Sequence, residues 1–230
     1  MNKIPYALIL FLFTLAILPA QSQSRMADPD PLRFENELEA FAAWDHKNSH
    51  PEKAILFVGS SSIKGWDTHR AFPGRAVINR GFGGSHISDV AFYYPQAIKK
   101  YDPGLVVFYA GDNDIAANKP VEQVFGDYRS LVDRILGDNP DVRFLYISIK
   151  PSGSRWDKWN KMKAFNQQVN EYNLKNDRLF YVDLATPLLN SEDRPDNGYF
   201  LEDQLHLNDR GYRVWNEKMR AELEKLFPGE

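Results

Sequence analysis

The stretch AILFVGSSS, residues 54 to 62, is a short apolar run that ends in one glycine and three serines. A run of this length and composition is typical of a buried strand that enters a tight turn. Four similar runs follow along the chain, namely RAVINRGFGG (75–84), GLVVFYAGDND (104–114), VRFLYISIK (142–150) and RLFYVDL (178–184). The pattern predicts five buried strands.

The segments around these runs carry apolar residues at helical spacing. The spacing is seen in Phe34, Leu38, Phe41 and Trp44; in Val90, Tyr94 and Ile98; in Val124, Tyr128, Leu131 and Ile135; in Phe165, Val169 and Tyr172; and in Tyr212, Trp215, Met219 and Leu223. Alternating strands and helices predict an α/β fold, a parallel sheet covered by helices on both faces. With 43% hydrophobic residues in 230, the chain can bury one sizeable core, and we expect one domain.

The first 20 residues predict an export signal. Lys3 precedes the apolar run YALILFLFTLAIL, and Pro19, Ala20, Gln21 and Ser22 follow it. The run is shorter than the roughly 20 residues of a membrane-spanning helix, so cleavage is favoured over a retained anchor. We expect a signal peptide over 1–22, a linker over 23–31 and the domain over 32–230. The mature protein is then periplasmic or extracellular, without stable membrane insertion.

Charge and cysteine content exclude several classes of partner and chemistry. Lys and Arg number 28 and Asp and Glu 31, so no overall field favours nucleic acid or an anionic membrane. No nucleic-acid partner is expected. Because the chain has no cysteine, it has neither a disulfide framework nor thiol catalysis.

Small polar turns follow the first three strands, as GSSS, GFGGS and GDND. In an open parallel sheet, ligands bind beyond the carboxyl ends of the strands, near the point where the strand order reverses. Ser60, Ser61 and Ser62 are candidate nucleophiles there, because a serine beside a helix N-terminus is exposed to a potential that favours a developing oxyanion. Helix capping is the other use of serine at such a turn.

Gly83, Gly84 and Asn113 are candidate oxyanion donors in the next two turns. Glycine lets a backbone amide approach a ligand closely, and the Asn113 side chain can donate a hydrogen bond. The alternatives are a tight strand-to-helix turn for the glycines and a turn asparagine bonded to its own backbone.

The sequence DQLH after the fifth strand contains Asp203 and His206. His206 can act as the general base of a catalytic triad, and Asp203 can orient it. A spacing of three residues on a turn can put the carboxylate and the imidazole on one side. Asp203 can then hold one ring nitrogen while the other faces the nucleophile.

The order of these four blocks resembles that of the SGNH (GDSL-like) hydrolases, whose blocks carry a Ser, a Gly, an Asn and an Asp-x-x-His. The blocks read VGSSSI, NRGFGGS, YAGDND and DQLH here, and the resemblance spans Ile55 to Leu226. It implies a single three-layer α/β/α domain with a five-stranded, flavodoxin-like parallel sheet. It also implies hydrolysis of carboxylic esters without a metal or other cofactor.

By position, the resemblance implies that Ser61 is the nucleophile and that Asp203 and His206 complete the triad. The Ser61 amide, Gly84 and Asn113 then match the oxyanion hole. One position departs from the family pattern, because Ser60 stands where an aspartate commonly precedes the nucleophile.

Two other functions fit parts of the sequence. Asp112 and Asp114 could hold Mg²⁺ in a metal-dependent phosphatase, a reading that leaves DQLH without a role. A non-catalytic module that binds a carbohydrate or lipid could share the fold, because fold alone does not establish activity.

The sequence indicates little about the substrate beyond the aromatic residues near the predicted site. Trp66, Trp156 and Trp159 lie near strand ends, and KPSGSRWDKW (150–159) is a loop that could roof the site. These rings could stack on a sugar, line an acyl pocket or pack within the protein. We expect a small-molecule or glycan ester with a short acyl group, such as acetyl.

Overall fold

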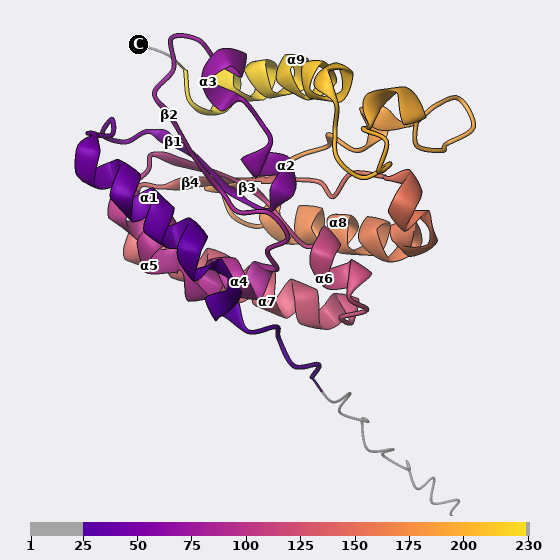
Figure 1. Ribbon diagram of the computed structural model, residues 1–230, viewed down its shortest axis with the longest axis horizontal. Coiled ribbons are helices and arrows are strands. Elements are labelled where there is room, and N and C mark those ends of the chain that lie inside the picture. Colours follow the sequence, from indigo (N-terminus) through magenta and orange to yellow (C-terminus); the bar gives the residue numbers. More distant parts are fainter. Residues whose placement is uncertain (1–24, 229–230) are drawn as a thin grey trace, which may run out of the picture.

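The computed structural model describes residues 25–228 and centres on a sheet of five parallel strands in the order β2-β1-β3-β4-β5 (Figure 1). The strands are β1 (Ile55–Gly59), β2 (Val77–Gly81), β3 (Leu105–Tyr109), β4 (Arg143–Ile147) and β5 (Leu179–Val182). Each strand lies within one of the five apolar runs, and all neighbouring pairs are parallel. The predicted five-stranded parallel sheet and its flavodoxin-like order are confirmed.

Helices connect the strands and cover both faces of the sheet. They are α1 (Glu35–Lys47), α2 (Ser61–Lys64), α3 (Thr68–Ala71), α4 (Ile87–Phe92), α5 (Tyr94–Ala97), α6 (Asp112–Ala116), α7 (Val121–Asp138), α8 (Trp159–Asn173) and α9 (Asp209–Leu226). Short 3-10 helices occur at η1 (Pro31–Phe34), η2 (Lys99–Tyr101), η3 (Gly153–Lys158), η4 (Thr186–Leu188) and η5 (Asn197–Tyr199).

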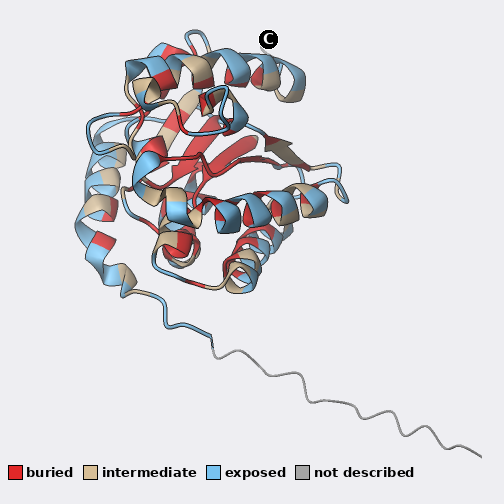
Figure 2. Cartoon of the chain, turned by 90° about the vertical axis from the view of Figure 1, so that its right-hand side faces the viewer, coloured by how far each residue is buried: buried red, intermediate tan, exposed pale blue. Residues whose placement is uncertain are grey.

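Two apolar clusters, one on each face of the sheet, form the core. Because side chains alternate along a strand, Leu56 and Val58 of β1 join the cluster beneath α1, α4, α7 and α8, whereas Ile55 and Phe57 join the cluster beneath α3 and α9. Figure 1 shows α3 and α9 on one side of the sheet and α1, α5, α4, α7 and α8 on the other. The strands between them are mostly buried, β1 and β3 throughout and β2, β4 and β5 in part (Figure 2). The three-layer α/β/α architecture is therefore confirmed.

The helix predicted from Val90, Tyr94 and Ile98 is two short helices, α4 and α5. Pro95 lies in the first turn of α5, where its missing N–H is tolerated, but it cannot continue the hydrogen bonding of α4. The spacing of the apolar residues persists across the break, so the same face of both helices packs against the core.

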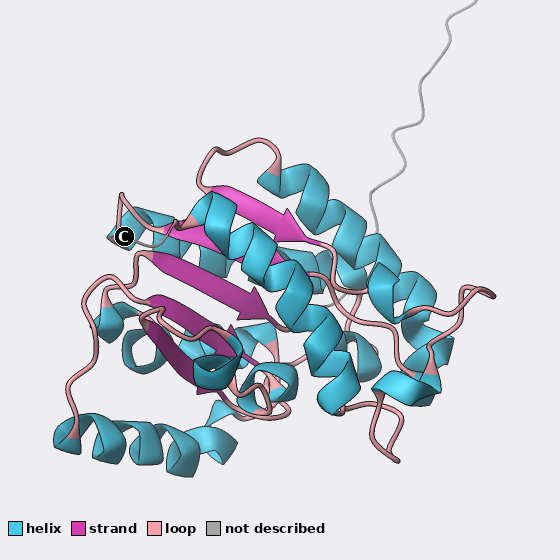
Figure 3. Cartoon of the chain, turned by 90° about the horizontal axis from the view of Figure 1, so that it is seen from above, coloured by secondary structure: helices cyan, strands magenta, loops and turns pink. Residues whose placement is uncertain are grey.

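The strand order reverses at β1, because β2 lies on one side of β1 and β3 lies on the other. Gly59 at the end of β1 is in register with Gly81 of β2 and Tyr109 of β3. The turns that leave these strands therefore begin at one edge of the sheet, which Figure 3 shows from above. This is the place where ligands bind in open α/β sheets.

The segment before η1 lies against the body of the domain. The signal peptide predicted over 1–22 and the first residues of the predicted linker lie outside the described residues. In the described part, Arg25 pairs with Asp127 (2.5 Å) and Asp28 with Lys119 (2.6 Å). Among residues 25–228, no helix combines the length and apolar character needed to cross a membrane.

Candidate active site

The chain leaves β1 through a turn that only glycine can make. Gly59 has φ +135°, and a Cβ there would lie 1.9 Å from the carbonyl oxygen of Tyr109 on β3. Ser60 then donates its amide to the same oxygen (2.9 Å) and precedes α2, so Ser61 is the first residue of that helix. The turn places Ser61 at the carboxyl edge of the sheet.

The three serines of this turn have different surroundings. Ser60 and Ser62 are almost completely buried, whereas Ser61 is partly exposed. The Ser61 Oγ lies 3.0 Å from Nε2 of His206, 145 residues away in the sequence. Ser61 is thus the serine of this turn that meets the imidazole.

The DQLH turn is closed by backbone hydrogen bonds and by the carboxylate of Asp203. Asp203 Oδ1 accepts the amides of Leu205 (2.9 Å) and His206 (3.0 Å). Gln204, which follows Asp203, takes a left-handed conformation with φ +52°. Leu201 donates its amide to the His206 carbonyl (2.8 Å). Asp203 and His206 are therefore held on one side of a tight turn.

The second carboxylate oxygen of Asp203 lies 2.5 Å from Nδ1 of His206. With Nδ1–H donated to this carboxylate, Nε2 is left to accept the Ser61 hydroxyl proton. The hydrogen bond from His206 lowers the pKa of the Asp203 carboxyl to about 2. The Asp203 and His206 side chains are 46% and 38% exposed, so the site is open to solvent.

The glycine turn after β2 lies against Ser61. A Cβ on Gly83 would be 3.6 Å from the Ser61 Cβ. Gly84 has φ +84° and is exposed, and a Cβ on it would meet nothing within 4 Å. The space above Gly84 is therefore open. Ser85 follows, and its carbonyl accepts the Asn113 Nδ2 at 3.0 Å.

Asn113 is held from both ends of its side-chain amide. Arg155 Nη2 donates to the Asn113 Oδ1 (2.9 Å), and the Asn113 Nδ2 donates to Ser85. Because a guanidinium only donates, it determines which end of the amide is oxygen and leaves a second Nδ2 hydrogen for another acceptor. The contacts of Ser85 and Arg155 with Asn113 were not predicted from the sequence. The only signal for Arg155 was its place in the 150–159 loop.

Asp112 and Asp114 are buried, and each faces a basic residue. Asp114 pairs with Lys119 (2.8 Å), while Asp112 lies 3.2 Å from Arg155 and 3.7 Å from Lys150. Burial raises the pKa of Asp114 to about 6 and lowers that of Lys150. In the part of the chain that the structure describes, no group of three or more His, Asp or Glu side chains is placed to hold a metal ion.

The three tryptophans named in the sequence analysis divide into two sets. Trp66 is 3% exposed and donates its Nε1 to Asn216 (2.7 Å), so it belongs to the core between the sheet and α9. Trp156 and Trp159 stand where the 150–159 loop enters α8, with their ring centres 5.9 Å apart. Trp159 is 7% exposed and belongs to the core on the other face of the sheet, whereas Trp156 is half-buried against it.

Comparison with known proteins places this geometry in a family. Residues 58–214 match the model of the GDSL-like Lipase/Acylhydrolase family, and no curated protein matches the chain. A GDSL-like lipase from Bacteroides thetaiotaomicron is 23% identical, with a TM-score of 0.72 over 82% of this chain and 97% of that chain. A protein from Bacteroides fragilis assigned as an acylhydrolase is also 23% identical, with a TM-score of 0.72 over 86% and 99%.

A third solved structure is a variant of an acetyl-xylooligosaccharide esterase from Geobacillus Stearmophilus, 14% identical, with a TM-score of 0.61 over 77% of this chain and 95% of that chain. At these identities the structures show a shared fold. The family match covers most of the chain, from the end of β1 into α9. The chain belongs to the GDSL-like lipase/acylhydrolase family, a family of ester hydrolases.

Proposed function

We propose that this protein is an exported serine esterase that hydrolyses short acyl esters with Ser61 as nucleophile. The observation that carries the proposal is the chain of hydrogen bonds from Ser61 Oγ through the His206 imidazole to Asp203. A nucleophile, a base within hydrogen-bond reach and a group that orients the base are the parts that acyl transfer requires. The export signal predicted over 1–22 supports a role outside the cytoplasm.

The proposed reaction has two steps through an acyl-enzyme. Ser61 Oγ attacks the ester carbonyl while His206 Nε2 takes its proton, and His206 then protonates the departing alcohol. Water, deprotonated by His206, attacks the acyl-enzyme. The bond from the acyl carbon to Ser61 Oγ breaks, Ser61 takes the proton back from His206, and the carboxylic acid is released. The amides of Ser61 and Gly84 and the Asn113 side chain are the proposed donors to the oxyanion in both steps.

Hydrolysis of p-nitrophenyl acetate, butyrate and octanoate by the mature protein, with and without EDTA, tests this proposal. We expect turnover that falls as the acyl chain lengthens and that does not change when EDTA is added, because the proposed mechanism uses no metal. Activity lost in EDTA and restored by Mg²⁺ would contradict the metal-free serine mechanism. Folded protein inert on all three esters would favour the binding module.

The rate should fall on the acid side of the pH profile. Only neutral His206 can take the Ser61 proton, so kcat/KM should decrease as the pH is lowered. Asp203 should not contribute, because the hydrogen bond from His206 lowers the pKa of its carboxyl from the ordinary 3.8 to about 2 and the carboxylate stays ionised. This lowered pKa adds stability above pH 3.8 that is lost as the pH falls toward 2.

The pH profile is measured as kcat/KM for p-nitrophenyl acetate between about pH 4 and pH 9. A rate that does not fall on the acid side would contradict this assignment.

Arg155 is proposed as a positioning residue for Asn113. Asn113→Ala should lower kcat about a hundredfold to a thousandfold, the usual loss for one oxyanion donor. Arg155→Met keeps the length of the side chain but removes the donor to Oδ1, so the amide can rotate; we expect a loss of about tenfold to a hundredfold in kcat with little change in KM.

A double-mutant cycle distinguishes positioning from a general structural effect. If Arg155 acts through Asn113, the double variant should be no slower than Asn113→Ala alone. Two losses that multiply would contradict the positioning role. Thermal unfolding of each variant controls for loss of fold.

A further inference from the structure

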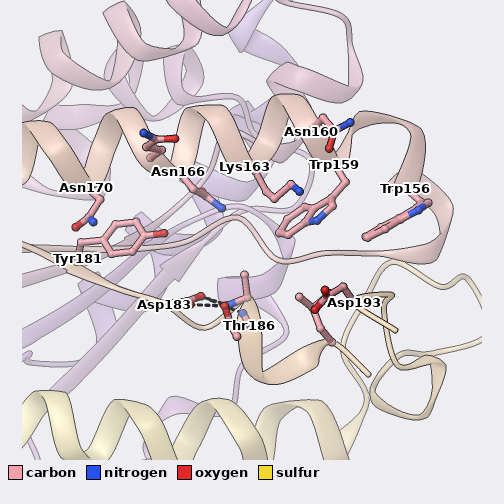
Figure 4. A pocket seen from close by; sticks show the side chains of 13 residues that line it. Trp156, Trp159, Asn160, Lys163, Asn166, Asn170, Tyr181, Asp183, Thr186 and Asp193 are labelled. Carbon is pink, nitrogen blue, oxygen red and sulfur yellow. Dashed lines mark hydrogen bonds between the residues drawn. The ribbon is translucent and has the colours of Figure 1, made fainter. Parts of the chain in front are cut away.

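A hollow of about 510 Å³ lies between α8 and the chain that leaves β5 (Figure 4). We call it the α8 groove. Its walls include the rings of Trp156, Trp159 and Tyr181 and the polar side chains of Asn160, Lys163 and Asn170. Its volume is in the range of small-ligand sites, about 300 to 1,000 Å³.

Two amides of this groove are not used by the fold. Asn166, on the same helix, exchanges hydrogen bonds with the backbone of Ile149 (2.8 and 3.0 Å), and Gln167 donates to Glu171 (2.8 Å). Asn160 and Asn170, in contrast, make no side-chain hydrogen bond with any residue in the described range 25–228. Their donors and acceptors are available to a ligand, next to the aromatic rings.

The charges of the groove favour a neutral ligand. Lys163 is its basic residue, and Asp183 and Asp193 are its acidic ones, so it has no excess of positive charge for a phosphate or carboxylate. Asp183 already caps the turn at Thr186 (3.0 Å). An extended acyl chain would have to lie against the amides and charges and would desolvate them without a hydrogen bond.

Aromatic rings beside amides match the surface of a sugar, which has apolar C–H faces and hydroxyls around its edge. The Trp156 and Trp159 rings are stacked, with an interplanar angle of 19°. Arg194, on an exposed turn, lies over the Trp156 ring with its guanidinium carbon 5.0 Å from the ring centre. Arg194 therefore has to move off this face of the ring before a sugar can stack there, and its guanidinium can then donate to the sugar hydroxyls.

A second hollow borders the turn that carries Asp203 and His206. It has a volume of about 470 Å³, shares Trp156 with the α8 groove and reaches Gly153 and Gln204. Gln204 lies between Asp203 and His206, and its carbonyl accepts the amide of Ser154 (3.1 Å). The two hollows together follow the 150–159 loop from α8 to the turn that holds the triad.

We propose that these two hollows form a glycan-binding groove, which takes the sugar chain of a neutral acylated oligosaccharide while the ester is at Ser61. The inference deepens the proposed esterase function and rests on it for the ester. The binding of sugar is a separate property that can be measured without catalysis.

The test uses the mature Ser61→Ala variant, so that binding is measured without turnover. Xylohexaose, cellohexaose, mannohexaose and chitohexaose are titrated by calorimetry, with octanoate as the acyl-chain probe. We expect at least one oligosaccharide to bind and octanoate not to bind. Adding Trp156→Ala should weaken that oligosaccharide at least tenfold.

Two further variants keep the test independent of folding. The double replacement of Asn160 and Asn170 by alanine should also weaken binding. Asn160 is exposed and Asn170 is partly exposed, so the loss of their amides should not disturb the core. Trp44→Ala is the matched control, since Trp44 is a 62% exposed tryptophan on α1, outside the groove. It should leave oligosaccharide binding unchanged.

Failure of the groove and failure of the esterase proposal give different results. Lack of binding by all four oligosaccharides, or equal affinities in the Trp156→Ala and Trp44→Ala variants, would overturn the groove, whatever the wild-type protein does to p-nitrophenyl acetate. Octanoate binding that depends on Trp156 would overturn it as well. Oligosaccharide binding that depends on Trp156, in a wild-type protein inert toward esters, would support the groove and overturn the esterase.

Discussion

Ser61→Ala should lower kcat for p-nitrophenyl acetate by roughly 10⁴-fold or more. The Ser61 hydroxyl is the one in its turn that meets the His206 Nε2, and at 3.0 Å it is within reach for proton transfer. Without it, His206 has no nucleophile to activate except water, and only the oxyanion donors and substrate binding remain. Stopped-flow or steady-state assays of wild-type and variant protein under the same conditions measure the loss.

Ser60→Ala and Ser62→Ala are the matched controls for this prediction. Both hydroxyls are buried, and neither contacts His206. Removing the Ser60 hydroxyl breaks no hydrogen bond to a described residue, since its Oγ has no such partner. We expect both variants to keep kcat within about tenfold, because a hydroxyl outside the reacting chain affects the rate only through small shifts of the turn. A Ser62→Ala variant as slow as Ser61→Ala would contradict the choice of nucleophile.

Asp203→Asn should lower kcat by roughly 10³- to 10⁴-fold while the protein stays folded. The asparagine keeps an oxygen that can accept the amides of Leu205 and His206, as Asp203 Oδ1 does at 2.9 and 3.0 Å. It loses the second oxygen, which faces the His206 Nδ1 at 2.5 Å. An amide nitrogen at that position favours the wrong tautomer and does not stabilise the imidazolium formed during attack.

Asp203→Ala separates the two roles of this residue. It removes the acceptor for the backbone amides as well, so it should lower both kcat and the melting temperature, whereas Asp203→Asn should lower mainly kcat. Circular dichroism melting and kcat for both variants test this. A fully active Asp203→Asn variant would show that this carboxylate does not orient His206.

The sequence by itself determined the class of fold and the order of its parts. Buried parallel strands have to be short and apolar throughout, and helices on a sheet have to repeat their apolar residues every three or four positions, so both patterns are visible without the structure. The turns with Ser61 and Asn113 were predicted to lie together because turns at the carboxyl ends of parallel strands meet at one edge. Asp203 and His206 were predicted from their spacing of three residues in DQLH and from the resemblance to the SGNH hydrolases.

Only the tertiary structure decided which side chains meet. Three adjacent serines are equivalent in sequence, and the turn after Gly59 is what buries Ser60 and Ser62 and leaves Ser61 beside His206. Arg155 and Asn113 are 42 positions apart in the sequence. The spacing of apolar residues predicts strands and helices, but it does not predict a contact between two such distant polar side chains.

The burial of the tryptophans was likewise decided only by the tertiary structure. Trp66 and Trp156 both follow strand ends, yet one is 3% exposed in the core and the other is half-buried in the wall of the α8 groove. Local sequence determines whether a segment is a strand, a turn or a helix. Whether a large side chain fills the core or lines a cavity depends on which distant elements pack against it, and that is determined only when the chain is folded.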